Sequence, residues 1–192
     1  SEIELTKMYD VSRITIRNAL SELVENGFLT RWQGKGTFVT GAKIEKNISD
    51  FMGFTETCEL RGLKASTYTI SKNIISGNER MCSNLQVPVE SDLVSIERVR
   101  YADDIPVIHE TIFLSDDYSF LLDEDTNNSL YILLAKKAIY PSSAKKQMEV
   151  CYANKVESEA LSIPLFSALL LIIDQVFDNQ GNIIHVSKQA IR

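Results

Sequence analysis

The chain has 192 residues, of which 44% are hydrophobic and 24% are charged, so it is long enough for two modest globular domains. No segment approaches the roughly 18 consecutive apolar residues that span a bilayer, and the first residues, SEIELTKMYD, lack the basic and apolar regions of a signal peptide. Two histidines and three widely spaced cysteines offer little material for a metal centre, a Ser-His-Asp triad or a disulfide framework. We therefore expect a cytoplasmic globular protein that has no membrane partner, no metal and no other cofactor.

The formal net charge of −6 argues at first against a nucleic-acid partner, because phosphate binding needs basic surface. The charge is unevenly distributed, however. Residues 1–46 hold seven Lys or Arg and six Asp or Glu, a net charge of +1, so the remaining residues carry −7. The acidic total therefore does not exclude a nucleic-acid partner for the first segment.

Two helices are predicted in the first 27 residues. Ser1 and Glu4 fit a capping box at the start of a short helix over residues 2–9. Ser12 is a good N-cap for a second helix, which Gly27 would end. The apolar residues of this second helix recur at helical spacing and predict its core side: Ile16, Ala19, Leu20, Leu23 and Val24.

The other side of the second helix carries two basic residues one turn apart. Arg13 and Arg17, with Thr15 between them, can reach phosphates and base edges in a DNA major groove. Taken alone, two such arginines are more often solvated charges on a surface helix. Their interpretation therefore depends on the segment that comes after the helix.

A β-hairpin with a glycine-rich tip is predicted after Gly27. The segments FLTRW and TFVT are rich in β-branched and aromatic residues, and QGKG between them supplies turn residues. Gly34 and Gly36 would let the backbone approach DNA closely, and Lys35 would contact a phosphate. A hairpin in this position has the features of a DNA-binding wing.

Residues 11–39, VSRITIRNALSELVENGFLTRWQGKGTFV, resemble the winged helix-turn-helix of the GntR family of bacterial transcription regulators. The resemblance implies that residues 1–40 form a DNA-binding domain. The family's first helix would precede Ser1, so we expect the chain to be part of a longer protein, and Ile3 stands where the family usually has an arginine. The resemblance implies DNA contacts on the recognition helix and the wing, at Ser12, Arg13, Thr15, Arg17, Gln33, Gly34 and Lys35.

Residues 41–50 lack a sustained periodicity and are interpreted as a linker. Beyond them, strand-like segments with period-two alternation are joined by turn signals, which predicts an α+β domain built on a curved antiparallel sheet. The predicted strands are ASTYTISK, LVSIERVRYA, IPVIHETIFL, AKKQMEVCYAN, ALLLIIDQVFD and NIIHVSKQAI. The predicted short helices are ERMCSNLQV, SLYILLAKKAI and KVESEALSI.

This second region resembles the UTRA ligand-sensing domain, which accompanies GntR winged helices in the HutC-like branch and is related in fold to chorismate lyase. The resemblance rests on the order and spacing of FTETCELRGL, IERVRYADDIPVIHETIFL, NNSLYILLAKKAI and GNIIHVSKQAI. It implies that residues 51–192 form an effector-binding and dimerisation domain.

Arg98 and Arg100 are two residues apart on a predicted strand, so they point to the same face, where an anion would relieve their repulsion. In phosphosugar sensors of the family, matching arginines surround the phosphate together with residues that match Ser129 and Tyr131. The resemblance also implies effector contacts for Thr55, Glu110 and His185, although related sensors often have a glutamate at the position of His185.

Each of these assignments has a structural alternative. The two arginines could form surface salt bridges, Tyr131 could pack at a domain rim, and His185 could be a structural histidine. The sequence leaves these alternatives open.

The shared pocket depends on the turn at Asp103-Asp104. A plain two-residue loop would put Glu110 on the face opposite Arg98 and Arg100. We therefore expect a three-residue loop, which would set Ile96 opposite Glu110, or an equivalent bulge, with Asp104 in the left-handed conformation.

Together these patterns predict a ligand-responsive repressor and not an enzyme. A homodimer would bind a palindromic operator in double-stranded DNA, and a small anionic effector, for instance a phosphosugar, would release it. Two alternatives remain open from the sequence: an enzyme with chorismate-lyase-like chemistry, and a DNA-binding dimer that has no effector.

Overall fold

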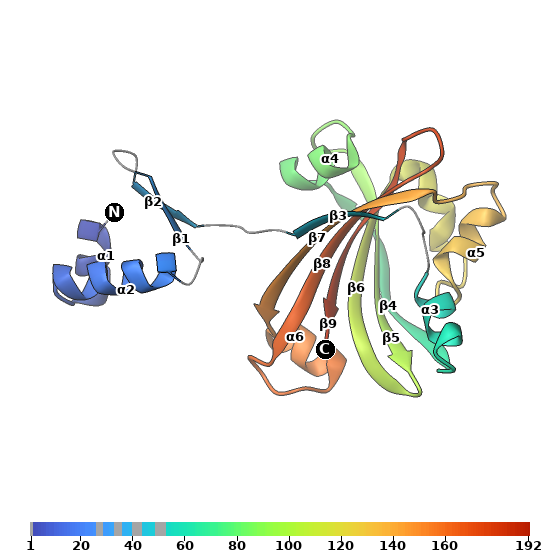
Figure 1. The fold of residues 1–192 in the computed structure, drawn as a ribbon. Helices are drawn as coiled ribbons and strands as arrows, with labels where there is room; N and C mark the ends of the chain where they lie inside the picture. The colour runs from blue at the N-terminus through green and yellow to red at the C-terminus, as the bar shows by residue number, and fades with distance from the viewer. Residues whose placement is uncertain (1, 26–28, 33–35, 40–43, 49–52) are drawn as a thin grey trace. The chain divides into compact units, whose positions relative to one another are not determined.

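The computed structural model describes residues 2–25, 29–32, 36–39, 44–48 and 53–192. The chain divides into two compact units, Ser1–Lys43 and Ile44–Arg192, and each is described separately (Figure 1). Among the described residues, no helix has the length and apolar character that crossing a membrane requires.

The first unit consists of two helices and a hairpin. Helix α1 spans Glu2–Tyr9 and α2 spans Arg13–Glu25, while β1 (Leu29–Trp32) pairs with β2 (Gly36–Val39) in antiparallel register. These elements confirm the predicted helix–helix–hairpin order. On the side of α2 predicted to be core, Ile16 is buried, Leu20 and Val24 are half-buried, and Ala19 and Leu23 are exposed.

The second unit is built on a seven-stranded antiparallel sheet with the order β3-β7-β8-β9-β6-β5-β4 (Figure 1). Six of its strands are those predicted from the alternation of apolar residues. The seventh, β3, was unexpected, because it lies inside the segment interpreted as a linker and pairs with β7 at the edge of the sheet. The strands are β3 (Ile44–Ile48), β4 (Ala65–Ser76), β5 (Asp92–Ala102), β6 (Ile105–Ser115), β7 (Ser143–Tyr152), β8 (Ala168–Phe177) and β9 (Ile183–Ile191).

Helices cover both faces of this sheet. Helix α5 (Leu130–Ala135) and the 3₁₀ helix η1 (Asp116–Leu122) pack on one face, against Val94 of β5 and its neighbours. Helices α4 (Glu79–Leu85) and α6 (Lys155–Leu161) pack on the other face. Successive residues of a strand point to opposite faces, so Leu93 packs with α4 while Val94 packs with α5. This arrangement explains why β5 and β6 are buried on both faces along much of their length.

The β5–β6 hairpin turns through two residues and not three. Ala102 pairs with Ile105, and the intervening Asp103 and Asp104 have φ values of 48° and 64°. Two consecutive left-handed residues are typical of a type I′ turn, and aspartate tolerates this region better than most residues. The predicted conformation of Asp104 is therefore confirmed, while the predicted three-residue loop is wrong.

A β-bulge lies one residue pair beyond the turn and shifts the register between β5 and β6. Such a bulge was the predicted alternative to a three-residue loop. Tyr101 pairs with Pro106 and Arg100 pairs with Ile108, so Val107 is an extra residue on β6. Proline has no N–H to donate to the ladder, which favours an irregularity at this point. Beyond the bulge Glu110 pairs with Arg98, whereas the predicted partner was Ile96.

Candidate functional site

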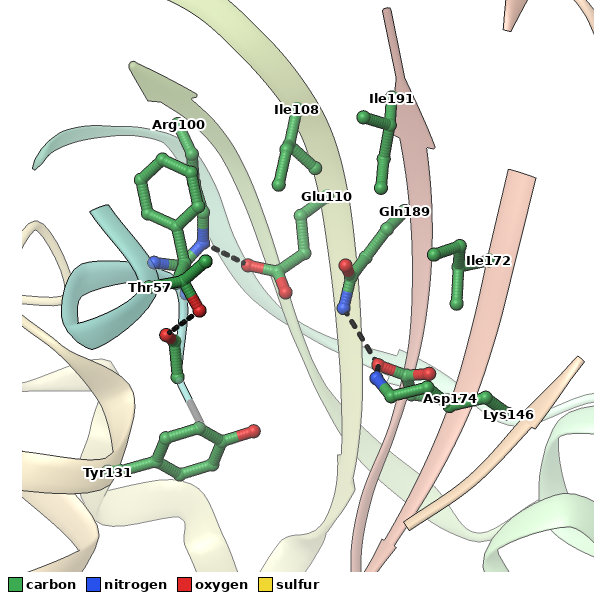
Figure 2. Close-up of a pocket in the computed structure, with 12 residues that line it drawn as sticks. Thr57, Arg100, Ile108, Glu110, Tyr131, Lys146, Ile172, Asp174, Gln189 and Ile191 are labelled. Atoms are coloured by element: carbon green, nitrogen blue, oxygen red, sulfur yellow. Dashed lines mark hydrogen bonds and ion pairs between the residues drawn. The ribbon is translucent and has the colours of Figure 1, made fainter. Parts of the chain in front are cut away.

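A pocket of about 320 Å³ opens on the sheet face that α5 and α3 (Phe54–Leu60) border (Figure 2). Small-molecule sites in proteins have volumes from roughly 300 to 1,000 Å³, so this pocket suits a small ligand. The strand register explains why distant residues meet here, because Glu110 pairs with Gln189 across β6 and β9. The pocket is lined by Gly53, Phe54, Thr57, Arg100, Ile108, Glu110, Tyr131, Lys146, Ile172, Asp174, Gln189 and Ile191.

A buried carboxylate between two arginines forms one side of the site. Glu110 Oε2 accepts hydrogen bonds from Arg98 Nη2 at 2.7 Å and from Arg100 Nε at 2.9 Å. The Arg100 guanidinium also lies over the Phe54 ring, 5.2 Å from its centroid, and so connects this ion pair to α3. Two cations that share one carboxylate leave a net positive charge on this side of the pocket.

The surroundings of Glu110 decide its protonation state. Burial alone would raise its pKa, but the positive charges and hydrogen bonds of Arg100 and Arg98 outweigh burial and lower the pKa from 4.5 to about 2. Burial also lowers the pKa of Arg98, and the Glu110 carboxylate opposes that effect. Both groups therefore stay charged at neutral pH.

Arg98 holds Glu110 in place but does not line the pocket. Its side chain is 0% exposed, and Arg98 Nη1 donates to the Thr126 carbonyl at 3.2 Å. The prediction that Arg98, Arg100 and Glu110 share one face is confirmed, while the prediction that Arg98 lines the pocket is wrong. The physical reason is the bulge, which sets Glu110 directly opposite Arg98 and so closes the ion pair over that guanidinium.

The half-buried Tyr131 and the buried His185 form a pair beside the ion pair. The Tyr131 hydroxyl and His185 Nε2 lie 3.2 Å apart, and their rings stack with centroids separated by 6.0 Å. Burial lowers the pKa of His185 to about 4, so its imidazole is neutral at physiological pH. His185 Nδ1 is buried and has no hydrogen-bond partner among the described residues.

The predicted DNA-contacting residues of α2 are exposed, and its two arginines contact Glu2 of α1. Arg13 Nε and Arg17 Nη2 lie 3.4 Å and 3.5 Å from the Glu2 carboxylate. Ser12 caps the helix by accepting from the Thr15 N–H at 3.2 Å. Both arginines therefore have exposed side chains, and each forms an ion pair with the Glu2 carboxylate.

Comparison with known families identifies both units. The model of the gntR family of bacterial regulatory proteins matches residues 1–39, and the UTRA domain model matches residues 60–192. This chain belongs to the GntR family and carries a UTRA domain.

Individual relatives of this GntR-family chain agree with that assignment. The transcriptional regulator YurK of Bacillus subtilis (strain 168) is 33% identical over 97% of this chain and 78% of its own length. A protein of Escherichia coli (strain K12) named a probable fructoselysine utilization operon transcriptional repressor is 32% identical over 100% of this chain and 80% of its own length. The solved structure of PhnF from Mycobacterium smegmatis shares the fold, with a TM-score of 0.71, 24% identity, and coverage of 100% of this chain and 85% of that one. This GntR-family chain is a DNA-binding transcription regulator and not an enzyme.

Besides Arg98, three more predicted effector residues of the GntR-family chain lie outside the pocket lining. Thr55 lies in the first turn of α3 and not on a loop, and the pocket is lined instead by Phe54 and Thr57, which are three residues apart and share one side of the helix. Ser129 is the N-cap residue of α5 but makes no side-chain capping bond. His185 contacts the Tyr131 hydroxyl and is not among the residues that line the pocket. The predicted pocket positions of Arg100, Glu110 and Tyr131 are confirmed, and their role in binding stays a prediction.

The sequence reasoning missed a second polar group in the pocket. Lys146, Asp174 and Gln189 line it from β7, β8 and β9, and Asp174 interrupts the apolar run LLLIIDQVF. An acid inside a strand that is otherwise apolar was the available signal, because burying a carboxylate is costly unless it has partners. The predicted wing residues Gln33, Gly34 and Lys35 lie outside the described residues.

Proposed function

We propose that this GntR-family chain is a ligand-responsive transcription repressor of the cytoplasm that binds a palindromic operator as a homodimer. A small anionic effector, for instance a phosphosugar, would bind in the pocket of the UTRA domain and release the operator. The observation that carries the proposal is the pocket itself, in which Arg100 and Glu110 meet at the wall.

The charge of the pocket favours an anion. Three cations, Arg98, Arg100 and Lys146, face two carboxylates, Glu110 and Asp174, so the group carries a net charge of +1. An anionic ligand would neutralise this charge in a partly buried setting, where electrostatic attraction is stronger than in water. Arginine also recognises phosphate and carboxylate groups through paired N–H donors.

The name of one relative supports a sugar-related effector. The E. coli relative is named for fructoselysine utilization, and fructoselysine is a sugar derivative. The polar side chains around the pocket suit such a molecule, since hydroxyl groups need both donors and acceptors.

The chain connection suggests how an effector could influence DNA binding. Phe54 and Thr57 line the pocket from α3, which begins six residues after β3 ends, and β3 directly follows the first unit. A ligand that contacts α3 therefore acts on the segment that leads to the DNA-binding unit. A dimer is needed because one recognition helix reads only a few base pairs, and two half-sites supply the affinity and specificity of an operator.

Calorimetry and gel shifts test the proposal together. Sugar phosphates and the matching free sugars are titrated into the full chain, and each binder is then added to the operator complex. We expect a sugar phosphate to bind and to release the operator, and Arg100→Met to weaken that binding at least tenfold. Arg80→Met, a change at an exposed arginine of α4, serves as the matched control.

Three outcomes would contradict the proposal. Binding that leaves the operator complex intact would show that the ligand is not an effector. Equal affinities of Arg100→Met and the wild type would place the ligand elsewhere. A monomer with full operator affinity in sedimentation analysis would refute the homodimer.

A further inference from the structure

A second polar cluster, consisting of Lys146, Asp174 and Gln189, lies in the same pocket; we call it the Lys146 cluster (Figure 2). Lys146 and Asp174 are direct cross-strand partners, and Gln189 extends from β9 beside them. Figure 2 shows Gln189 between the Glu110 carboxylate and Asp174. The cluster therefore occupies the end of the pocket away from Arg100.

The hydrogen bonds within the Lys146 cluster leave some of its donors and acceptors without a partner among the described residues. Asp174 Oδ2 accepts from Lys146 Nζ at 2.5 Å and from Gln189 Nε2 at 3.1 Å. Asp174 Oδ1 is buried and has no hydrogen-bond partner among the described residues. A lysine ammonium has three donors, and within the described part of the chain Lys146 uses one, to Asp174. The cluster thus offers an acceptor and donors to a bound molecule.

This combination selects the chemistry of the ligand group. An anion at the cluster would be repelled by Asp174, and a cation would be repelled by Lys146, so a charged group meets one favourable and one unfavourable neighbour. A hydroxyl group donates and accepts at the same time and can satisfy both side chains. The opposite end of the pocket differs, because Arg98 and Arg100 outnumber Glu110 and leave an uncompensated positive charge.

We infer that the Lys146 cluster is a polyol subsite that binds hydroxyl groups of the effector, while the anionic group of the same effector lies at Arg100. The inference rests on the proposed function and adds the orientation of the ligand. Glu110 and Asp174 lie on strands separated by β9, about 10 Å apart across the sheet, so the ligand has to reach from one end to the other. Ile172 and Ile191 line the same pocket and offer apolar surface to its C–H groups.

Comparing three kinds of probe across variants tests the orientation. Hexose 6-phosphates, the matching free hexoses and inorganic phosphate are titrated calorimetrically into the full chain, into Asp174→Asn and into Lys146→Met. Lys145→Met, the neighbouring position on the opposite face of β7, is the matched control. We expect both cluster variants to lose about tenfold or more in affinity for a hexose 6-phosphate and less than about twofold for inorganic phosphate.

Other patterns of affinity across the probes and variants would overturn the inference, or would show that the polyol subsite and the anionic effector stand or fall separately. Equal losses for phosphate and hexose phosphate would place the anion at the cluster, and unchanged affinity for hexose phosphate would remove the cluster from the site. If only free hexoses bind and Asp174→Asn abolishes that binding, the polyol subsite stands and the anionic effector fails. If no probe binds the wild type, the subsite fails as well. The melting temperature of each variant checks its folding, and Gln189→Leu replaces any variant that unfolds.

Discussion

Replacing Glu110 by glutamine removes the negative charge from between two buried guanidinium groups. Arg98 and Arg100 would then face each other without a carboxylate, with side chains 0% and 9% exposed. Breaking a buried ion pair by removing one partner costs roughly 3–5 kcal/mol, so we expect Glu110→Gln to lower the free energy of unfolding by an amount in this range at pH 7. Urea denaturation measures this difference, and Glu149→Gln, a change at an exposed carboxylate on β7, is the control.

The pH dependence provides the sharper test. The pKa of Glu110 is lowered from 4.5 to about 2 in the folded chain, so its contribution to stability is complete above the unfolded value and is lost as pH falls through the folded value. With one pKa unit worth about 1.4 kcal/mol, linkage predicts a loss on the order of 2 kcal/mol by pH 3 and about 3 kcal/mol by pH 2. The glutamine variant cannot lose this contribution.

The stability gap between the wild type and Glu110→Gln should therefore narrow by about 2 kcal/mol between pH 7 and pH 3. Carboxylates that do not interact with Glu110 titrate equally in both proteins and cancel in the difference. The exception is Asp174, whose pKa is raised by burial and further by the Glu110 charge. A gap that stays constant across this range would refute the reasoning, because it would mean that Glu110 is not charged or not held by the arginines. A gap that widens towards acid would reverse the sign of the linkage.

The remaining predictions concern the DNA-binding unit and the core. Arg17→Ala should weaken specific operator binding about tenfold or more in a gel shift while the melting temperature stays unchanged, because the side chain is 60% exposed; unaltered affinity would contradict its proposed role. Glu2→Gln should strengthen DNA binding severalfold, since it frees Arg13 and Arg17 from a competing carboxylate, and weaker binding would show that Glu2 positions them instead. Gly77→Ala should destabilise the chain by about 1–3 kcal/mol in urea, because an added Cβ would lie 2.5 Å from Cys82 Sγ; a neutral effect would mean that the site relaxes at little cost.

Local sequence patterns were sufficient to predict most of the fold. Alternation of apolar residues located six strands, and Ser12 was correctly predicted as the N-cap of α2, because these signals depend only on neighbours in the sequence. The edge strand β3 was missed for the opposite reason. Its five residues carry no strong alternation, and they are held by pairing with β7, which lies about 100 residues further along the chain.

The candidate site shows the same division between local and long-range information. The common face of Arg98 and Arg100 followed from their spacing, but the position of Glu110 depended on one extra residue, Val107, which the sequence could not distinguish from a longer loop. The Lys146 cluster required the register of three strands at once, and a one-residue slip in any of them would turn its side chain to the other face.

The bulge at Val107 accounts for both the stability and the polarity of the pocket. Without the extra residue, Arg98 would pair with His109 and the Glu110 side chain would point to the α6 face, so two buried arginines would face each other without a counter-charge. With it, Arg98 and Arg100 share one carboxylate, and one positive charge of the group remains uncompensated. The fold thus buries one guanidinium as a structural partner and leaves the second at the pocket wall, where the proposed anionic effector would supply the missing negative charge.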